Sequence, residues 1–121
     1  MKNRPIHERF GFALDGLRVV FQSERSFRTE CAFAVAAAVA LLVLRPGWQW
    51  AALITICAMV VMALELLNSA LEYLIDHIHP DIAPAVKHAK DAAAAAVLVA
   101  SCGSVCVAAL MLLSVFLPSL N

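Results

Sequence analysis

Four polar side chains interrupt a strongly apolar run between residues 63 and 76, and their spacing fits one face of a helix. They are Glu65, Asn68, Glu72 and Asp76, which follow one another at intervals of 3, 4 and 4 residues. Residues three and four positions apart lie on the same side of an α-helix, so these four are expected to form a narrow line, called here the polar stripe. Ionisable groups in such apolar surroundings are costly, which makes the stripe a candidate functional site.

The depth of the polar stripe follows from the apolar segment that precedes it. If this helix enters a membrane near Trp50, a rise of 1.5 Å per residue places Glu65 about 22 Å farther in, near the far edge of a ~30 Å hydrocarbon layer. Glu72 then lies about 10 Å beyond Glu65, at the level of the headgroups. A lipid headgroup and a water-soluble molecule could meet along such a stripe. Glu65 would be placed to accept a proton there.

Two further charged clusters are expected at the same membrane depth. One is residues 23–30 (SERSFRTE) and the other is residues 87–91 (KHAKD). Their charged side chains are Glu24, Arg25, Arg28, Glu30, Lys87, Lys90 and Asp91. Carboxylates can hold Mg²⁺ together with phosphate oxygens, and basic side chains can neutralise phosphates. These are the groups that phosphoryl transfer requires.

The residues alone leave the class of protein open. The sequence has neither a G-x-x-x-x-G-K-[ST] loop nor a G-x-G-x-x-G fingerprint for nucleotide phosphates. A membrane enzyme, a small proton-coupled transporter that uses Glu65, and a non-catalytic membrane subunit all remain compatible with the polar stripe. The transporter would need no ATP, and it leaves the charged cluster at residues 87–91 unexplained. A non-catalytic subunit would tolerate neutralisation of the stripe.

The elements that must position these side chains are membrane helices. The chain has 121 residues, of which 63% are hydrophobic and only 15% are charged, whereas a soluble domain carries about 25% charged residues. Residues 46–64 and 92–121 contain no charge and reach the ~20 residues that cross a bilayer. The sequence predicts an all-α membrane protein of one domain, residues 1–121, with three transmembrane helices at about 27–45, 47–76 and 88–117.

The N-terminal segment has the pattern of an amphipathic helix. Its apolar residues recur at intervals of three and four, with charged and polar residues between them. These apolar residues are Ile6, Phe10, Leu14, Leu17 and Phe21. The spacing predicts a surface helix at about residues 5–23, lying on the membrane.

The distribution of basic residues predicts the orientation. Eight of the nine lysines and arginines precede the first span or lie between the second and third, and only Arg45 lies in the other loop. Loops rich in basic residues stay in the cytoplasm. We therefore expect the N-terminus and the polar stripe to face the cytoplasm and the C-terminus to lie outside. Trp48 and Trp50 suit the outer membrane interface.

Two segments together resemble the signature of a known family. They are ELLNSALE at residues 65–72 and AKDAAAAAVL at residues 89–98, with GLR and ERSFRTE matching upstream in order and spacing. This combination resembles the prokaryotic diacylglycerol kinase family over residues 12–98. The resemblance implies a small membrane kinase of three spans with an amphipathic N-terminal helix, in a bacterial cytoplasmic (inner) membrane. It also implies a homotrimer whose active sites are shared between neighbouring subunits.

The resemblance also implies roles for individual residues. Glu65 would be the catalytic base that takes the proton of a lipid hydroxyl, and Asn68 would help to position the reacting groups. Glu24 and Glu72 would hold the Mg²⁺ that accompanies ATP. The residues implied in ATP binding are Glu24, Glu72, Asp81, Lys90 and Asp91. The residues implied on the lipid side are Arg18, Phe27, Arg28, Glu30 and Glu65.

The implied reaction is the transfer of phosphate from ATP to diacylglycerol, giving phosphatidic acid at the cytoplasmic membrane face. The partners would be ATP, the lipid alcohol, membrane lipids and further copies of the chain, with no role for nucleic acid. Undecaprenol kinases of the same family are the alternative. SERSFR and the alanine-rich segment resemble that branch, whereas GLR and Glu30 resemble the diacylglycerol branch. Ala94, where the diacylglycerol branch has a serine, bears on this choice.

Overall fold

The protein is a bundle of long helices with one helix set across it. The computed structural model describes residues 2–120, and its helices are α1 (Ile6–Ser23), α2 (Arg25–Leu44), α3 (Trp48–Ile78), α4 (Pro84–Phe116) and a short 3₁₀ turn at Pro118–Leu120. The described residues contain no β-strand. Helices α2, α3 and α4 are each long and apolar enough to cross a membrane. The predicted all-α class with three membrane-spanning helices is therefore confirmed, and α1 is the additional N-terminal helix.

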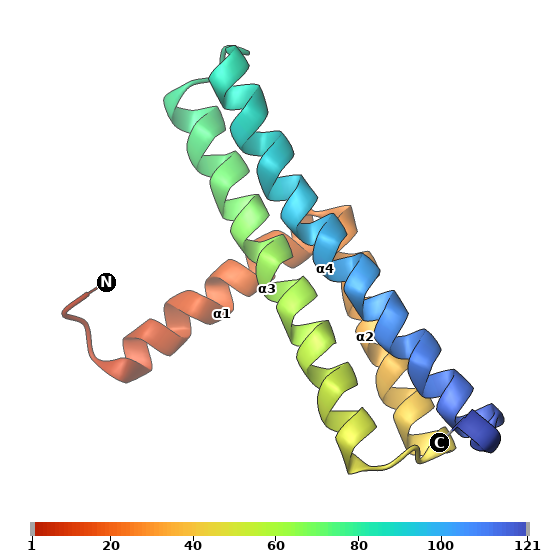
Figure 1. The fold of residues 1–121 in the computed structure, drawn as a ribbon. Helices are drawn as coiled ribbons and strands as arrows, with labels where there is room; N and C mark the ends of the chain where they lie inside the picture. Colours follow the sequence, from red (N-terminus) through yellow and green to blue (C-terminus); the bar gives the residue numbers. More distant parts are fainter. Residues whose placement is uncertain (1, 121) are drawn as a thin grey trace.

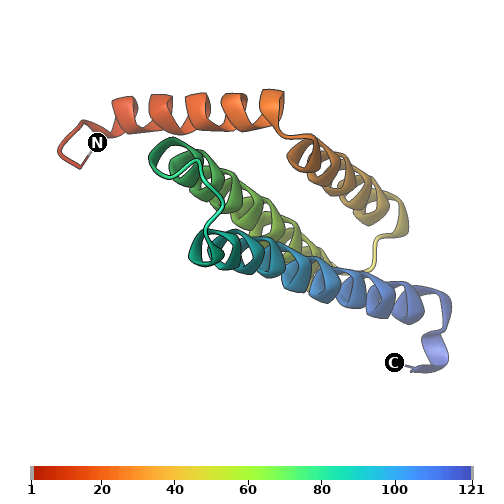
Figure 2. The same cartoon turned by 90° about the horizontal axis from the view of Figure 1, so that it is seen from above.

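Helix α3 is the centre of the bundle. It packs along α4 as an antiparallel hairpin, while α2 packs mainly on α3. Figure 2 shows α3 lying between α1 and α4. At 1.5 Å per residue, α2 is about 30 Å long and α3 is about 46 Å long, so the α3–α4 hairpin extends beyond the level at which α2 begins (Figure 1). This protruding part, residues 74–91, is called here the hairpin tip.

The helix ends follow the turn chemistry of the sequence. Helix α4 begins at Pro84, four residues before the expected start at 88, because proline at the first helical position has the right φ and needs no N–H partner. The turn between α2 and α3 contains Arg45 at φ 47° and Gly47 at φ 110°, and both values lie in the region of positive φ that glycine adopts readily. Between α1 and α2 the helix is broken at Glu24 alone, whose backbone is extended.

A single arginine secures the junction between α1 and α2. The Nη1 of Arg28 donates hydrogen bonds to the backbone oxygens of Phe21 at 2.7 Å and Gln22 at 2.9 Å. These carbonyls belong to the last turn of α1, where intrahelical donors are lacking and a positive charge is favourable. Phe27, beside Arg28, is the most buried apolar side chain in the described structure, at 2% exposure. The first turn of α2 is thus held by the hydrogen bonds from Arg28 to α1 and by the burial of Phe27.

Most apolar side chains of the isolated chain face outward. The buried apolar residues are few: Val20, Phe27, Ile54, Val61 and Met111. Along α1, Ile6 is 71% exposed and Phe10 is 68% exposed, on the face that the sequence predicts to contact lipid. A membrane supplies the apolar surroundings that such surfaces require, so the outward-facing apolar residues agree with three spanning helices and a surface helix.

Candidate active site

The polar stripe lies on α3, and its burial changes along its length. Glu65 is buried with 6% of its surface exposed, Asn68 and Glu72 are half-buried, and Asp76 is exposed. Ser69, on the same helix, is more deeply buried still, at 2% exposure. The stripe therefore starts inside the bundle and ends in the hairpin tip.

Glu65 receives one hydrogen bond, from a residue that sequence reasoning did not assign to the site. The hydroxyl of Ser26, in the first turn of α2, donates to Glu65 Oε2 at 3.2 Å. No lysine or arginine among residues 2–120 forms an ion pair with Glu65. Ser26 lies inside the SERSFRTE cluster, but its contact is with a residue 39 positions away. Only the packing of α2 on α3 reveals it.

Asn68 has an unsatisfied oxygen. Its Oδ1 is buried and has no hydrogen-bond donor among the described residues. A buried polar atom without a partner costs about 1–3 kcal/mol, so such atoms are rare in folded proteins. The expected donor is a group outside the single chain, from a bound substrate or a neighbouring subunit.

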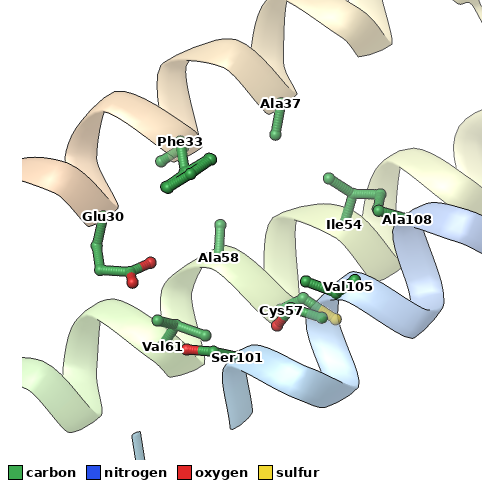
Figure 3. Close-up of a pocket in the computed structure, with 12 residues that line it drawn as sticks. Glu30, Phe33, Ala37, Ile54, Cys57, Ala58, Val61, Ser101, Val105 and Ala108 are labelled. Atoms are coloured by element: carbon green, nitrogen blue, oxygen red, sulfur yellow. The ribbon is translucent and has the colours of Figure 1, made fainter. Parts of the chain in front are cut away.

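An apolar cavity of about 260 Å³ lies between α2, α3 and α4 (Figure 3). Its lining includes Phe33, Ile54, Cys57, Val61, Ser101 and Val105. Figure 3 shows Glu30 at one end of the cavity, with its carboxylate directed towards α3. Glu30 is also within electrostatic range of Glu65. The structure thus places one carboxylate, that of Glu30, at the end of an apolar cavity formed by three helices.

The hairpin tip contains three of the five predicted nucleotide-binding residues, Asp81, Lys90 and Asp91. Lys90 Nζ donates to Asp76 Oδ1 at 2.5 Å, which links α4 to the last residue of the stripe. Lys87 pairs with Asp91 at 2.5 Å on the same face of α4. Asp81 is exposed in the loop between α3 and α4, where its backbone oxygen lies 2.9 Å from His79 Nδ1.

The two predicted metal ligands lie beside one interhelical contact. Ser23 and Tyr73 form a hydrogen bond between their hydroxyls, and they precede Glu24 and follow Glu72 directly in the chain. Both carboxylates are half-buried, and neither forms an ion pair in the part of the chain that the structure describes. No group of three or more histidine, cysteine or acidic side chains is arranged to hold a metal ion within residues 2–120.

Three residues predicted on the lipid side have different surroundings. Phe27 is buried at the junction, and Arg28 is engaged with the carbonyls of α1. Arg18 is exposed and lies 4.0 Å from Asp15, one turn earlier in α1. Phe27 and Arg28 thus hold the junction together, while Arg18 lies on the exposed side of α1 beside Asp15.

Comparison with known proteins identifies the family of the chain. A family model described as "Prokaryotic diacylglycerol kinase" matches residues 11–112. A protein named diacylglycerol kinase from Haemophilus influenzae is 35% identical over 91 residues, which cover 75% of this chain and 77% of that protein. Another of the same name from Synechocystis is 35% identical over 105 residues, covering 86% of this chain and 60% of that protein.

The family match includes α2, α3 and the first 29 residues of α4, and so every helix that contributes to the site described above. The resemblance seen in the sequence motifs is confirmed by these matches. The chain therefore belongs to the prokaryotic diacylglycerol kinase family and is a membrane-embedded lipid kinase.

Proposed function

We propose that this lipid kinase transfers the γ-phosphoryl group of ATP to diacylglycerol and produces phosphatidic acid. The observation that supports this most directly is the buried carboxylate of Glu65. It lies in the bundle, on a stripe that leads to the water-exposed lysine and carboxylates of the hairpin tip. Glu30, within electrostatic range of it, closes one end of an apolar cavity. A lipid tail and a nucleotide can approach such a residue from opposite directions.

Glu65 would act as the general base. The lipid hydroxyl oxygen forms a bond to the γ-phosphorus while the bond from that phosphorus to the bridging oxygen of ADP breaks. The hydroxyl proton passes to Glu65, and ADP leaves. A positioned carboxylate typically contributes about 10²–10⁴-fold to the rate of such a step. The unsatisfied Asn68 oxygen would accept a hydrogen bond from a bound group and so fix its position.

The residues present fit a Mg²⁺ ion that arrives with the nucleotide. Mg²⁺ is usually held by one or two carboxylates together with substrate phosphates and water, rather than by a complete protein cage. Glu24 and Glu72 are two hard oxygen donors without an ion-pair partner among the described residues. When bound, Mg²⁺ supplies neutralisation of the phosphate charge. Lys90, Asp91 and Asp81 would contact the nucleotide.

We expect the protein to work as a homotrimer with shared sites, in a bacterial cytoplasmic membrane. Apolar side chains of the three spans face outward and are available for contacts with other copies of the chain. The buried Oδ1 of Asn68 has no hydrogen-bond donor among the described residues. Eight of the nine lysines and arginines lie in the N-terminal segment, the first turn of α2 or the hairpin tip, against Arg45 alone in the opposite loop, which favours a cytoplasmic location for the N-terminus and the site, with the C-terminus outside.

The test is phosphate transfer from ATP in mixed detergent–lipid micelles with Mg²⁺, offering dioleoylglycerol and undecaprenol in parallel. Preferential labelling of dioleoylglycerol is the expected result. Preferential labelling of undecaprenol would keep the chemistry and overturn the substrate. If a well-folded protein labelled neither lipid, the kinase proposal would fail and a proton-coupled transporter using Glu65 would become the leading function.

A further inference from the structure

We infer that Ser26 is a positioning residue for the general base, an inference that rests on the proposed function of Glu65. The hydroxyl of Ser26 donates to Glu65 Oε2 at 3.2 Å. Within the described residues it is the sole hydrogen-bond donor to this buried carboxylate. It would hold one carboxylate oxygen and leave Oε1 free to take the proton of the lipid hydroxyl.

The location of Ser26 in its helix explains why its hydroxyl reaches Glu65. Hydroxyl side chains within helices commonly donate to the carbonyl four residues earlier. Four other hydroxyl residues of this chain do so: Ser23 to Val19, Thr29 to Arg25, Thr55 to Ala51 and Ser104 to Ala100. Ser26 differs because α2 starts at Arg25, so its own helix offers no such carbonyl. The carbonyl four positions earlier, at Gln22, belongs to α1 and accepts from Arg28.

The backbone of Ser26 is fixed by its neighbours. Phe27 is buried to 2% exposure, and the Arg28 guanidinium is bound to two carbonyls of α1. The Arg28 contacts hold the first turn of α2 against the end of α1, and the Ser26 hydrogen bond joins the same turn to α3. A hydroxyl on this turn therefore has a fixed location relative to Glu65, as accurate positioning of a catalytic group requires.

The chemistry of a hydroxyl suits both protonation states of the base. A serine hydroxyl can donate one hydrogen bond and accept two, and it rotates freely about its C–O bond. It donates to the carboxylate before proton transfer and can accept from the protonated acid afterwards. Loss of this hydrogen bond would leave the carboxylate free to rotate away from the lipid hydroxyl, so it should be visible in the rate of the chemical step.

The first test compares Ser26→Ala, Ser26→Thr and the wild type in steady-state phosphorylation of dioleoylglycerol. We expect Ser26→Ala to lower kcat by about tenfold. The KM values for ATP and lipid should stay within about twofold, because Ser26 contacts the base and is not proposed to contact either substrate. Ser26→Thr retains the hydroxyl and should restore most of kcat. Thr29→Ala is the matched control, since Thr29 lies one turn later in α2 and bonds to its own helix.

Three kinetic results would overturn the inference. They are wild-type kcat in Ser26→Ala, an effect on KM alone, and a loss in Ser26→Ala that Ser26→Thr does not restore. A loss of similar size in Thr29→Ala would equally assign the effect to helix α2 as a whole and remove any special role of Ser26.

A second test separates this inference from the proposed function. Thermal unfolding of the wild type, Ser26→Ala, Glu65→Leu and the double variant measures the coupling between the two side chains. The positioning role is supported if the stability effects of Ser26→Ala and Glu65→Leu are coupled and if Ser26→Ala lowers kcat while Ser26→Thr restores it. Turnover without coupling refutes the role of Ser26 and leaves the kinase assignment standing. Coupling without phosphorylation of either lipid refutes the proposed function, and Ser26 is then a structural partner only.

Discussion

The two halves of the polar stripe consist of similar residues in different surroundings. Glu65 and Asn68 lie inside the bundle, where, among residues 2–120, a single serine hydroxyl is the partner of Glu65 and the Asn68 Oδ1 has no donor. Glu72 and Asp76 lie farther along α3, towards the hairpin tip, where Asp76 is 61% exposed and pairs with Lys90. Water and an opposite charge are available in the outer half and scarce in the inner half.

This difference indicates a division of roles. In an interior with few partners, a carboxylate interacts strongly with whatever group approaches it, because the local dielectric is low. In water, the same group is screened and suits the binding of a hydrated, highly charged molecule. The inner half is therefore suited to proton transfer and the outer half to the nucleotide and its metal ion. The predictions below test this division.

The largest effect is expected at the inner half, for Glu65→Gln. The amide keeps the shape and the hydrogen-bonding oxygen of the side chain but cannot act as a base. We expect kcat to fall by about 10²–10⁴-fold, the contribution typical of general base catalysis. Phosphorylation of dioleoylglycerol measures the rate, and helicity and thermal unfolding establish that the variant folds.

The control for Glu65→Gln is Glu8→Gln. Glu8 is an acidic residue of α1 in an exposed ion pair with Arg4, away from the polar stripe. Its replacement should leave turnover close to that of the wild type. Full activity in a well-folded Glu65→Gln variant would contradict the assignment of the base and, with it, the distinction between the two halves.

A smaller effect, of a different kind, is expected at Glu72→Gln. If Glu72 contributes a ligand to Mg²⁺, removing one negative charge from a half-exposed site should raise the Mg²⁺ concentration needed for half-maximal rate by about tenfold, since such a charge is worth ~1–2 kcal/mol. At saturating Mg²⁺ much of the rate should return. A Mg²⁺ titration at constant ATP measures this. An unchanged Mg²⁺ requirement would remove Glu72 from the metal site.

Tyr73→Phe is expected to lower stability, because it removes a hydrogen bond between the C-terminal end of α1 and helix α3. The Tyr73 hydroxyl bonds to Ser23, and this contact brings the α1–α2 junction, with Glu24, up to α3 beside Glu72. Loss of one such hydrogen bond should reduce the free energy of unfolding by about 0.5–1.5 kcal/mol. Thermal unfolding in micelles measures this. Ser23→Ala should cost at least as much, because the Ser23 hydroxyl also donates to the Val19 carbonyl, and the double variant should lose no more than Ser23→Ala alone. Additive losses would show that the hydroxyls do not interact.

The helices and the stripe could be predicted from sequence because they depend on local information. The spacing of Glu65, Asn68, Glu72 and Asp76 along one helix fixes their common face, and uncharged runs fix the spans. Helix α4 itself begins at Pro84, ahead of the expected span at 88–117, because proline is well suited to the first position of a helix.

The contacts between helices could not be predicted in the same way. The hydrogen bond from Ser26 to Glu65 joins residues 39 positions apart, and the cavity beneath Glu30 needs three helices to enclose it. Both depend on the register of α2 against α3. No residue pattern within α2 alone specifies this register, because its apolar residues occur all round the helix. The site residues named from the family motif remain predictions, which the variants test one by one.

The smallest effect is expected at the outer end of the stripe, for Asp76→Asn. Asp76 pairs with Lys90 in water, with side-chain exposures of 61% and 34%, and exposed ion pairs contribute only about 0–1 kcal/mol. Unfolding should change by less than about 1 kcal/mol, and the difference should shrink at high salt. Because the variant frees Lys90, the KM for ATP should stay the same or fall. Titration of ATP at two salt concentrations measures this. If Asp76→Asn reduced kcat as severely as Glu65→Gln, the outer half would take part in the chemical step itself, and burial would not be what separates the roles of these carboxylates.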